Sequence, residues 1–260
     1  MFVIGERINP AGKRELACAI REAKAAFIQK EAMDEERSGA DALDINVYLP
    51  DINRSQAMRM VVQSVRCVSK LPLVVDDQDP SVIQTGLECG APNVFINSPI
   101  SVGNLNKKVV ALAKQFKAEM LFVPLEKGRA LLAAADRIRV TRLVLEQLED
   151  AGISRDRVIV DAVLFALKQV KGKVTETLET IRQLKSELGV RAAIGLSNIS
   201  YGLQRRRKLN ARFLQLAKGC GLDVVICDPL QKEVMAVAKN KAKRLNHGEM
   251  KQFLEFAGAC

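Results

Sequence analysis

The sequence predicts an α/β protein that folds as a closed (βα)₈ TIM barrel. Short β-branched or apolar runs alternate with amphipathic stretches along the whole chain, which is the pattern of repeated βα units around a parallel sheet. About eight such units in 260 residues match the length typical of this barrel. Because strand number alone does not prove closure, an open doubly wound sheet is the alternative.

Each predicted strand is short and apolar, and the segment after it has helical periodicity and good helix formers. Gly152 and Gly189 each follow a helical segment and precede a strand, where glycine commonly caps a helix C-terminus. A helix added after the last βα unit is predicted at about residues 248–257. In chain order the predicted strands are Phe2–Gly5, Ala42–Asn46, Leu73–Asp76, Asn93–Asn97, Glu119–Pro124, Arg157–Asp161, Ala192–Ser197 and Asp223–Asp228.

No Pro/Gly/Ser-rich linker divides the chain, and a hydrophobic content of 48% supplies the core of one large barrel. One domain over residues 1–260 is therefore predicted. The first residues hold a four-residue apolar run without a basic leader or cleavage site, and no later apolar stretch approaches about 18 residues. These features predict a soluble, cytoplasmic protein with no membrane partner.

The cysteines are scattered without a CxxC pair, and the chain has one histidine, so there is little material for a zinc cluster. Cys220 and Cys227 are the closest pair but match no common ligand spacing. We interpret His247, beside Gly248, as a capping or surface residue rather than a catalyst. The sequence therefore predicts reduced thiols and no bound metal; the six cysteines are Cys18, Cys67, Cys89, Cys220, Cys227 and Cys260.

The chain is basic, with a formal net charge of +10, which favours an anionic partner such as nucleic acid, an acidic protein surface or a polyanionic small molecule. Aromatic residues make up only 4% of the chain and tryptophan is absent. The chain therefore has few aromatic side chains on which the bases of a single-stranded nucleic acid could stack. A solvated basic surface explains the charge equally well.

Polar residues stand at the carboxyl ends of the predicted strands, where a barrel of this kind builds its active site. Such residues also cap the helices that follow, which is the structural explanation for any one of them. Together, the acids and amides suit a flat heterocycle with an amidine-like edge, because a carboxylate accepts two hydrogen bonds from such an edge. The residues are Glu6, Asp44, Asn46, Asp76, Asp77, Asn97, Ser98, Asp161, Ser197, Asn198 and Asp228.

Other chemistries lack their motifs in this sequence. No GxGxxG follows a strand, no GxxxxGK[ST] occurs, and His247 offers no convincing Ser-His-Asp or Cys-His arrangement. Hydride transfer on a Rossmann site and acyl transfer through a triad are therefore disfavoured.

Six segments in chain order form a more specific pattern: Ile4–Pro10 (IGERINP), Ala42–Val47 (ALDINV), Leu73–Asp76 (LVVD), Phe95–Ser98 (FINS), Gly195–Ser200 (GLSNIS), and Leu209–Leu214 (LNARFL) with Gly221–Asp223 (GLD). This pattern resembles the pterin-binding methyltransferases, which include methyltetrahydrofolate:corrinoid protein methyltransferases and the folate domain of cobalamin-dependent methionine synthase. More distantly it is similar to dihydropteroate synthase. The resemblance runs nearly end to end and implies a dihydropteroate-synthase-like barrel.

The resemblance implies one catalytic side chain, Asn198, whose amide reaches N5 of the pterin. It also implies a set of pterin-binding residues: the side chains of Asp76, Asn97 and Asp161, the backbone near Gly195 and Ser197, and the basic loop residue Arg206.

The activity implied is methyl transfer between N5 of tetrahydrofolate and the cobalt of a corrinoid, in either direction. Since the chain has no Asp-x-His-x-x-Gly signature, the corrinoid (cobalamin) must arrive on a corrinoid-binding partner protein. Tetrahydrofolate or 5-methyltetrahydrofolate is the small-molecule substrate. Relatives commonly form homodimers through barrel helices, so the resemblance also implies a homodimer.

The chain departs from the family pattern at four positions, and at the first three the change can alter loop shape without removing the ring contacts. Tyr48 stands where glycine is usual, Asp77 where serine is common, and Ala162 where proline is common. Tyr201 stands where some relatives carry an amide side chain.

Two other functions remain open from the sequence. A dihydropteroate synthase would use the same pocket, but it needs a diphosphate site, and Gly195–Ser200 differs from the basic strand-end motif expected there. A non-catalytic folate-binding or nucleic-acid-binding protein would use the run Arg205–Lys208, which is short for a duplex footprint of several phosphates.

Overall fold

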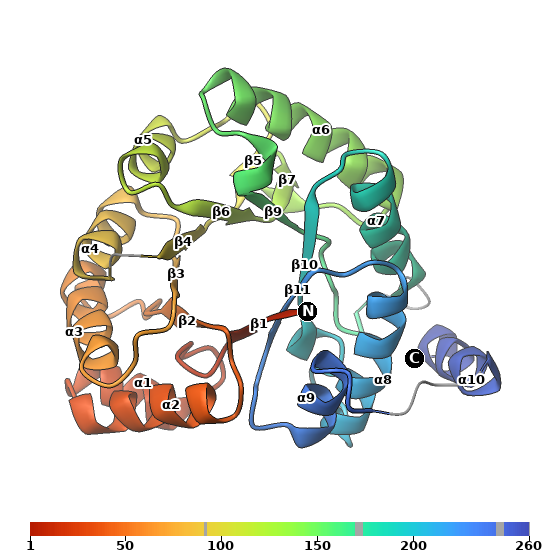
Figure 1. Cartoon of the computed structure of the whole chain (residues 1–260), viewed down its shortest axis with the longest axis horizontal. Helices are drawn as coiled ribbons and strands as arrows, with labels where there is room; N and C mark the ends of the chain where they lie inside the picture. Colours follow the sequence, from red (N-terminus) through yellow and green to blue (C-terminus); the bar gives the residue numbers. More distant parts are fainter. Residues whose placement is uncertain (91–92, 170–173, 243–246, 260) are drawn as a thin grey trace.

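Eight parallel strands close into a barrel in the computed structural model, which describes residues 1–90, 93–169, 174–242 and 247–259. The closed barrel predicted from the sequence is confirmed, and the open-sheet alternative is wrong. Around the barrel the strands follow the order β1-β11-β10-β9-β6-β4-β3-β2 (Figure 1). They are β1 (Phe2–Gly5), β2 (Ala42–Asn46), β3 (Leu73–Asp76), β4 (Val94–Asn97), β6 (Glu119–Phe122), β9 (Val158–Asp161), β10 (Arg191–Gly195) and β11 (Val224–Cys227).

Helices surround the strands on the outside of the barrel (Figure 1). Gly152 and Gly189 follow two of these helices with φ values of +84° and +63°, the left-handed conformation predicted for the two glycine caps. The helices are α1 (Arg14–Arg21), α2 (Ala25–Arg37), α3 (Arg54–Arg66), α4 (Pro80–Gly90), α5 (Lys107–Gln115), α6 (Ala134–Asp150), α7 (Val174–Ser186), α8 (Arg206–Gly219), α9 (Lys232–Ala238) and α10 (His247–Ala259).

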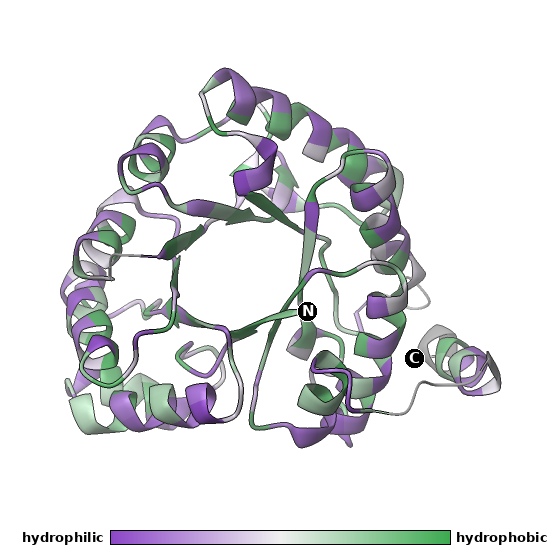
Figure 2. Cartoon of the chain, in the orientation of Figure 1, coloured by the Kyte–Doolittle hydropathy of each residue, from purple (hydrophilic) through white to green (hydrophobic). Residues whose placement is uncertain are grey.

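The barrel interior is filled by one apolar cluster to which every barrel strand contributes. Since successive side chains of a strand point to opposite faces, the residue two positions further along points into the barrel again. Figure 2 shows hydrophobic residues along the strands and hydrophilic residues on the helices around them. The cluster consists of Ile4, Ala42, Val74, Phe95, Leu121, Ile159, Ala193, Val224 and Ile226.

A small second sheet stands at the carboxyl ends of β4 and β6. Its order is β5-β7-β8, with β5 (Ile100–Ser101), β7 (Pro124–Glu126) and β8 (Arg129–Ala130). The strand predicted over Glu119–Pro124 is therefore wrong at its end, because β6 stops at Phe122 and Pro124 begins β7. Pro124 has no N–H to donate, and the neighbouring carbonyl of Val123 accepts a hydrogen bond from the N–H of Ile100 at 3.1 Å.

The C-terminal helix α10 spans the range in which an added helix was predicted and packs against α7 and α8 rather than across the barrel. The side chain of His247 and the whole of Cys260 lie outside the described residues. The other cysteines, Cys18, Cys67, Cys89, Cys220 and Cys227, are free thiols. Within the described ranges, no helix has both the length and the apolar character needed to cross a membrane.

A buried arginine fixes the loop that follows β9. Arg137 lies on the inward face of α6 with 1% of its surface exposed. Its guanidinium donates to the carbonyl oxygens of Leu131 and Ala162, each at 2.8 Å, and of Leu132 at 3.0 Å. The Thr177 hydroxyl donates to the Val163 carbonyl at 2.8 Å and lies 3.4 Å from the same guanidinium. Burial lowers the pKa of Arg137 to about 10, so the side chain stays charged at neutral pH.

Replacing this arginine should therefore destabilise the protein strongly. Arg137→Met keeps the apolar stem but leaves three carbonyl groups, of which that of Ala162 is buried, without their donor, so the free energy of unfolding should fall by about 3 kcal/mol. Arg182→Met is the control, because Arg182 is exposed and pairs with Glu179 at 3.1 Å; its loss should stay below about 1 kcal/mol. Urea unfolding of both variants measures the difference, and equal losses would contradict the role given to Arg137.

Candidate functional site

The side chains directly above the apolar cluster are polar and form one layer at the carboxyl-terminal mouth of the barrel. Each lies two residues beyond a member of the cluster on the same strand, so alternation along the strand points it inward. The layer comprises Glu6, Asp76, Asn97, Asp161 and Asp228, together with Gly195 on β10.

Asp76 and Asn97 are neighbours across β3 and β4, where they are paired in the strand register. Asn46, paired with Asp76 on the other side, donates from Nδ2 to Asp76 Oδ2 at 2.9 Å. Burial raises the pKa of Asp76 to about 6, although the Asn46 hydrogen bond opposes this shift. The sequence-predicted pair Asp76 and Asn97 thus lies together on the β3–β4 side of the mouth.

Asp44 lies deeper in the barrel, beneath this pair, and is fully buried. Burial, followed by the charge of Asp76, raises its pKa well above the ordinary value, while a hydrogen bond with Asn97 opposes the shift. Its Oδ1 has no partner among the described residues. Burial and the neighbouring charge thus both favour the protonated form of Asp44.

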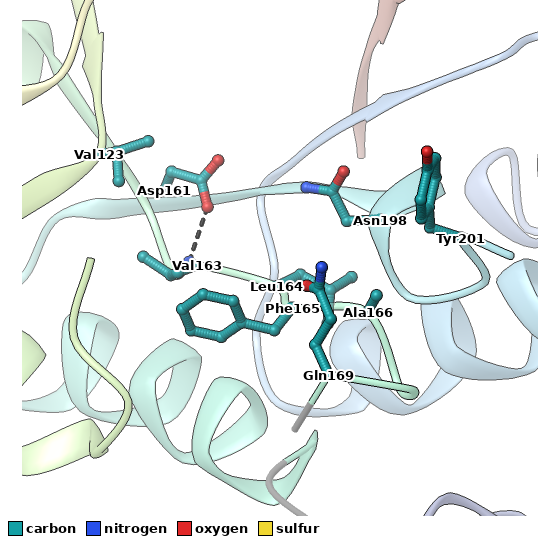
Figure 3. A pocket seen from close by; sticks show the side chains of 9 residues that line it. All are labelled: Val123, Asp161, Val163, Leu164, Phe165, Ala166, Gln169, Asn198 and Tyr201. Carbon is teal, nitrogen blue, oxygen red and sulfur yellow. Dashed lines mark hydrogen bonds between the residues drawn. The ribbon is translucent and has the colours of Figure 1, made fainter. Parts of the chain in front are cut away.

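A cavity of about 370 Å³ opens on the β9–β10 side of the mouth. Figure 3 shows the Asp161 carboxylate and the Asn198 amide directed toward the same space, with Phe165 and Leu164 below them. Asp161 Oδ1 accepts a hydrogen bond from the N–H of Val163 at 2.7 Å. Burial raises the pKa of Asp161 to about 6, against the opposing effects of this hydrogen bond and of Arg137.

The cavity wall after Asp161 contains a strained residue. Val163 has φ +59°, a left-handed conformation that β-branched residues rarely adopt. Its carbonyl is held by Thr177, and the preceding carbonyl of Ala162 by Arg137. The N–H of Ala162 donates to the Ala193 carbonyl at 2.8 Å, a bond that a proline at this position could not make.

Asn198 lies in a 3₁₀ turn (Leu196–Asn198) directly after β10 and is exposed toward the mouth. A Cβ on Gly195 would stand 3.2 Å from Asn198 Nδ2, so the glycine makes room for this amide. Helix α8 begins eight residues later at Arg206, with Arg205 at its N-cap. Asn198 therefore does not cap the following helix, and helix capping is excluded as the reason for an amide at this position.

Ser197 and Arg206 lie beside the cavity rather than among its lining residues. The Ser197 hydroxyl donates to the Glu6 carboxylate, and Arg206 donates to the Ser197 carbonyl at 3.0 Å and to the Ser200 hydroxyl at 3.1 Å. Burial raises the pKa of Glu6, while the hydrogen bond from Ser197 opposes this shift. In these contacts Arg206 holds the loop that presents Asn198.

Glu35, on helix α2, supports the end of β1 at the barrel mouth. It is fully buried, and its Oε1 accepts the N–H of Arg7 at 2.8 Å. A Cβ on Gly5 would overlap this carboxylate, so only glycine at the end of β1 permits the contact. Burial raises the pKa of Glu35 to about 8, which leaves the group largely protonated at neutral pH.

Several residues that shape the site were not predicted from the sequence. Phe165 and Gln169 line the cavity from a loop without any motif, and Glu35 and Arg137 hold its walls from helices. A signal existed for the last two, because each stands among apolar residues at helical spacing on an otherwise amphipathic helix.

Comparisons with known proteins agree with the six-segment resemblance. Methylcorrinoid:tetrahydrofolate methyltransferase of Eubacterium limosum is 23% identical over 244 residues, covering 90% of this chain and 88% of that protein. Methionine synthase of Mycobacterium tuberculosis (strain ATCC 25618 / H37Rv) is 27% identical over 243 residues, which are 87% of this chain but only 20% of that protein. The chain thus spans a fifth of the methionine synthase it matches.

Among solved structures, dihydropteroate synthase from Xanthomonas albilineans in complex with 7,8-dihydropteroate is similar with a TM-score of 0.70 at 20% identity, covering 92% of both chains. This likeness confirms the dihydropteroate-synthase-like fold. The family described as pterin binding enzyme matches residues 5–228, from the end of β1 to the residue after β11. Because this match covers most of the chain, the chain belongs to the pterin binding enzyme family.

Proposed function

We propose that this protein is a methyltransferase that moves a methyl group between N5 of tetrahydrofolate and the cobalt of a corrinoid on a partner protein. The observation that carries the proposal is the cavity in which the Asp161 carboxylate and the Asn198 amide face the same space. A methylcorrinoid:tetrahydrofolate methyltransferase matches over nearly its full length, which supports the same reaction.

In this proposal the pterin lies across the mouth between Asp161 on one side and Asp76 with Asn97 on the other. A carboxylate accepts two hydrogen bonds from the amidine-like edge of the ring, and an amide can donate and accept. Gly195 and Ser197 let backbone approach the ring, and Arg206 keeps their loop in place. The apolar side chains of Leu164 and Phe165 form the wall against which a flat ring packs.

The transfer itself needs no protein nucleophile. In one direction the N5 lone pair attacks the methyl group of methyl-cobalt(III), the carbon–cobalt bond breaks, and its electron pair stays on cobalt(I). The N5 cation then releases a proton. In the other direction N5 of 5-methyltetrahydrofolate first takes up a proton, cobalt(I) attacks its methyl group, the carbon–nitrogen bond breaks, and its electron pair returns to N5. Asn198 can serve both, because its amide accepts from a protonated N5 and donates to a neutral one.

A dihydropteroate synthase is a weaker candidate on the geometry of the β10 end. A synthase needs cations for a diphosphate, but Gly195–Asn198 contains neither lysine nor arginine, and Arg206 is bound to Ser197 and Ser200. The likeness to solved synthases lies at 20% identity or below, which supports the fold and not the reaction.

The first prediction concerns affinity for tetrahydrofolate. Asp161→Ala should weaken binding by about 3 kcal/mol, because the ring edge loses a charge-assisted partner. Binding by the parent should also weaken as the pH falls through about 6, where Asp161 and Asp76 take up protons and stop acting as carboxylates. Calorimetry from pH 5 to 8 measures both effects.

The control is Asp156→Ala, which removes an exposed acid at the opposite end of β9. An Asp161→Ala protein that binds tetrahydrofolate like this control would refute the placement of the pterin.

The second prediction tests the proposed role of Asn198. Asn198→Ala should lower the rate of methyl transfer from methylcobalamin to tetrahydrofolate by about 100-fold, while the dissociation constant for tetrahydrofolate changes little, because the amide acts where charge changes in the transition state. Single-turnover measurements that follow the cobalt oxidation state give the rate. Asn106→Ala is the matched control: Asn106 does cap a helix, accepting from the N–H groups of Lys108 and Val109, so this variant should lose about 1 kcal/mol of stability and keep its rate. An unchanged rate in Asn198→Ala would exclude the proposed role.

A further inference from the structure

The two tyrosines of this chain, which contains no tryptophan, both stand at the barrel mouth. Tyr48 lies in the loop after β2 and Tyr201 in the loop after β10. They are 65% and 66% exposed, the highest values among the exposed large hydrophobic side chains of the described residues. In the order of the closed barrel, β2 and β10 are three strands apart, so the two rings flank the mouth from different sides.

The Tyr48 ring is held in place although it is exposed. Its N–H donates to Asn46 Oδ1 at 2.8 Å, which ties the loop to the residue that also contacts Asp76. The guanidinium of Arg54 lies 5.3 Å from the centre of the ring. Arg54 in turn donates to both carboxylate oxygens of the buried Asp77, at 2.7 and 2.9 Å. An arginine backed by a buried acid thus supports one face of Tyr48.

Tyr201 is placed next to the proposed site of methyl transfer. Its N–H donates to the Asn198 carbonyl at 3.0 Å, and its side chain lines the cavity that contains the Asn198 amide. Figure 3 shows the ring beyond Asn198, at the edge of the cavity away from Asp161. A molecule that reaches N5 from solvent past Asn198 therefore meets Tyr201.

We propose that Tyr48 and Tyr201 form a docking rim for the corrin macrocycle of the methyl donor or acceptor. This inference rests on the proposed function, since it assigns that reaction's second substrate to a surface. Flat, weakly polar rings suit a flat macrocycle, because stacking buries apolar area on both partners without leaving a charge unpaired. Tyr201 lines the cavity that contains the amide facing N5, and Tyr48 stands on another side of the mouth, so a macrocycle that brings its cobalt over the mouth lies between the two rings.

The charge beside Tyr201 suits a macrocycle delivered by an acidic protein surface. Arg205, Arg207 and Lys208 are exposed, and within the described ranges none of them forms an ion pair with a carboxylate. Such unpaired cations would steer an acidic carrier toward the mouth and leave the aromatic rings to contact its cofactor.

The test uses free hydroxocobalamin as the probe, and cobinamide, which lacks the nucleotide phosphate, as its counterpart. Since the fluorescent residues lie at the mouth, quenching of tyrosine emission reports binding there, and equilibrium dialysis gives the dissociation constant. Tyr48→Ala and Tyr201→Ala should each weaken binding of both probes about tenfold. Tyr48→Phe and Tyr201→Phe should retain it, as should Leu143→Ala, which removes an exposed apolar side chain from α6.

Several results would overturn the docking rim: no saturable binding to the parent, alanine variants that bind like the parent, or binding of cobalamin without cobinamide. It would also be overturned if only Tyr201→Ala weakened binding and the same variant lost affinity for tetrahydrofolate, since Tyr201 would then belong to the pterin cavity. Methyl transfer from methylcobalamin is measured separately. If the parent transfers methyl groups normally and the alanine variants bind the probes like the parent, the proposed function stands and the docking rim is refuted. If probe binding depends on the tyrosines but no methyl transfer occurs, the docking rim stands and the proposed function is refuted.

Discussion

The alternation of side chains along eight parallel strands is the constraint on which this molecule depends. Because every second residue points into the barrel, one register places an apolar residue of each strand in the interior cluster and the next inward residue at the mouth. The acids and amides of the site therefore come from strands far apart in sequence and still form one layer. A register shift of one residue in any strand would turn its polar side chain into the helix layer.

Burying polar side chains above an apolar interior costs free energy, and contacts from the surrounding helices offset part of that cost. Burial raises the pKa of Asp44, Asp76 and Asp161, because it disfavours their charged forms. Groups outside the barrel hold the backbone beside these acids, most clearly Arg137 under the β9 loop and Glu35 behind β1. Second-layer groups of this kind keep the first layer in one geometry.

The barrel strands could be predicted to within one or two residues, because a short apolar run bounded by polar residues has few other structures available to it. The polar strand ends were predicted for the same reason. Arg137 and Glu35 escaped prediction because a single charge on a helix is usually solvated, although both stand at the spacing of the apolar face of their helices. The β5-β7-β8 sheet is made of two- and three-residue strands, too short to have a periodicity of their own. The roles of the individual site residues stay predictions.

The left-handed conformation of Val163 bears on how this cavity could change over evolutionary time. A β-branched residue at φ +59° stores about 1–3 kcal/mol of backbone strain, which the contacts of Arg137 and Thr177 must outweigh. A glycine there would relax the strain, but it would also remove a buried side chain from the cavity wall and give the unfolded chain more freedom. A change at this one position therefore alters the shape of the cavity and the stability of the chain together.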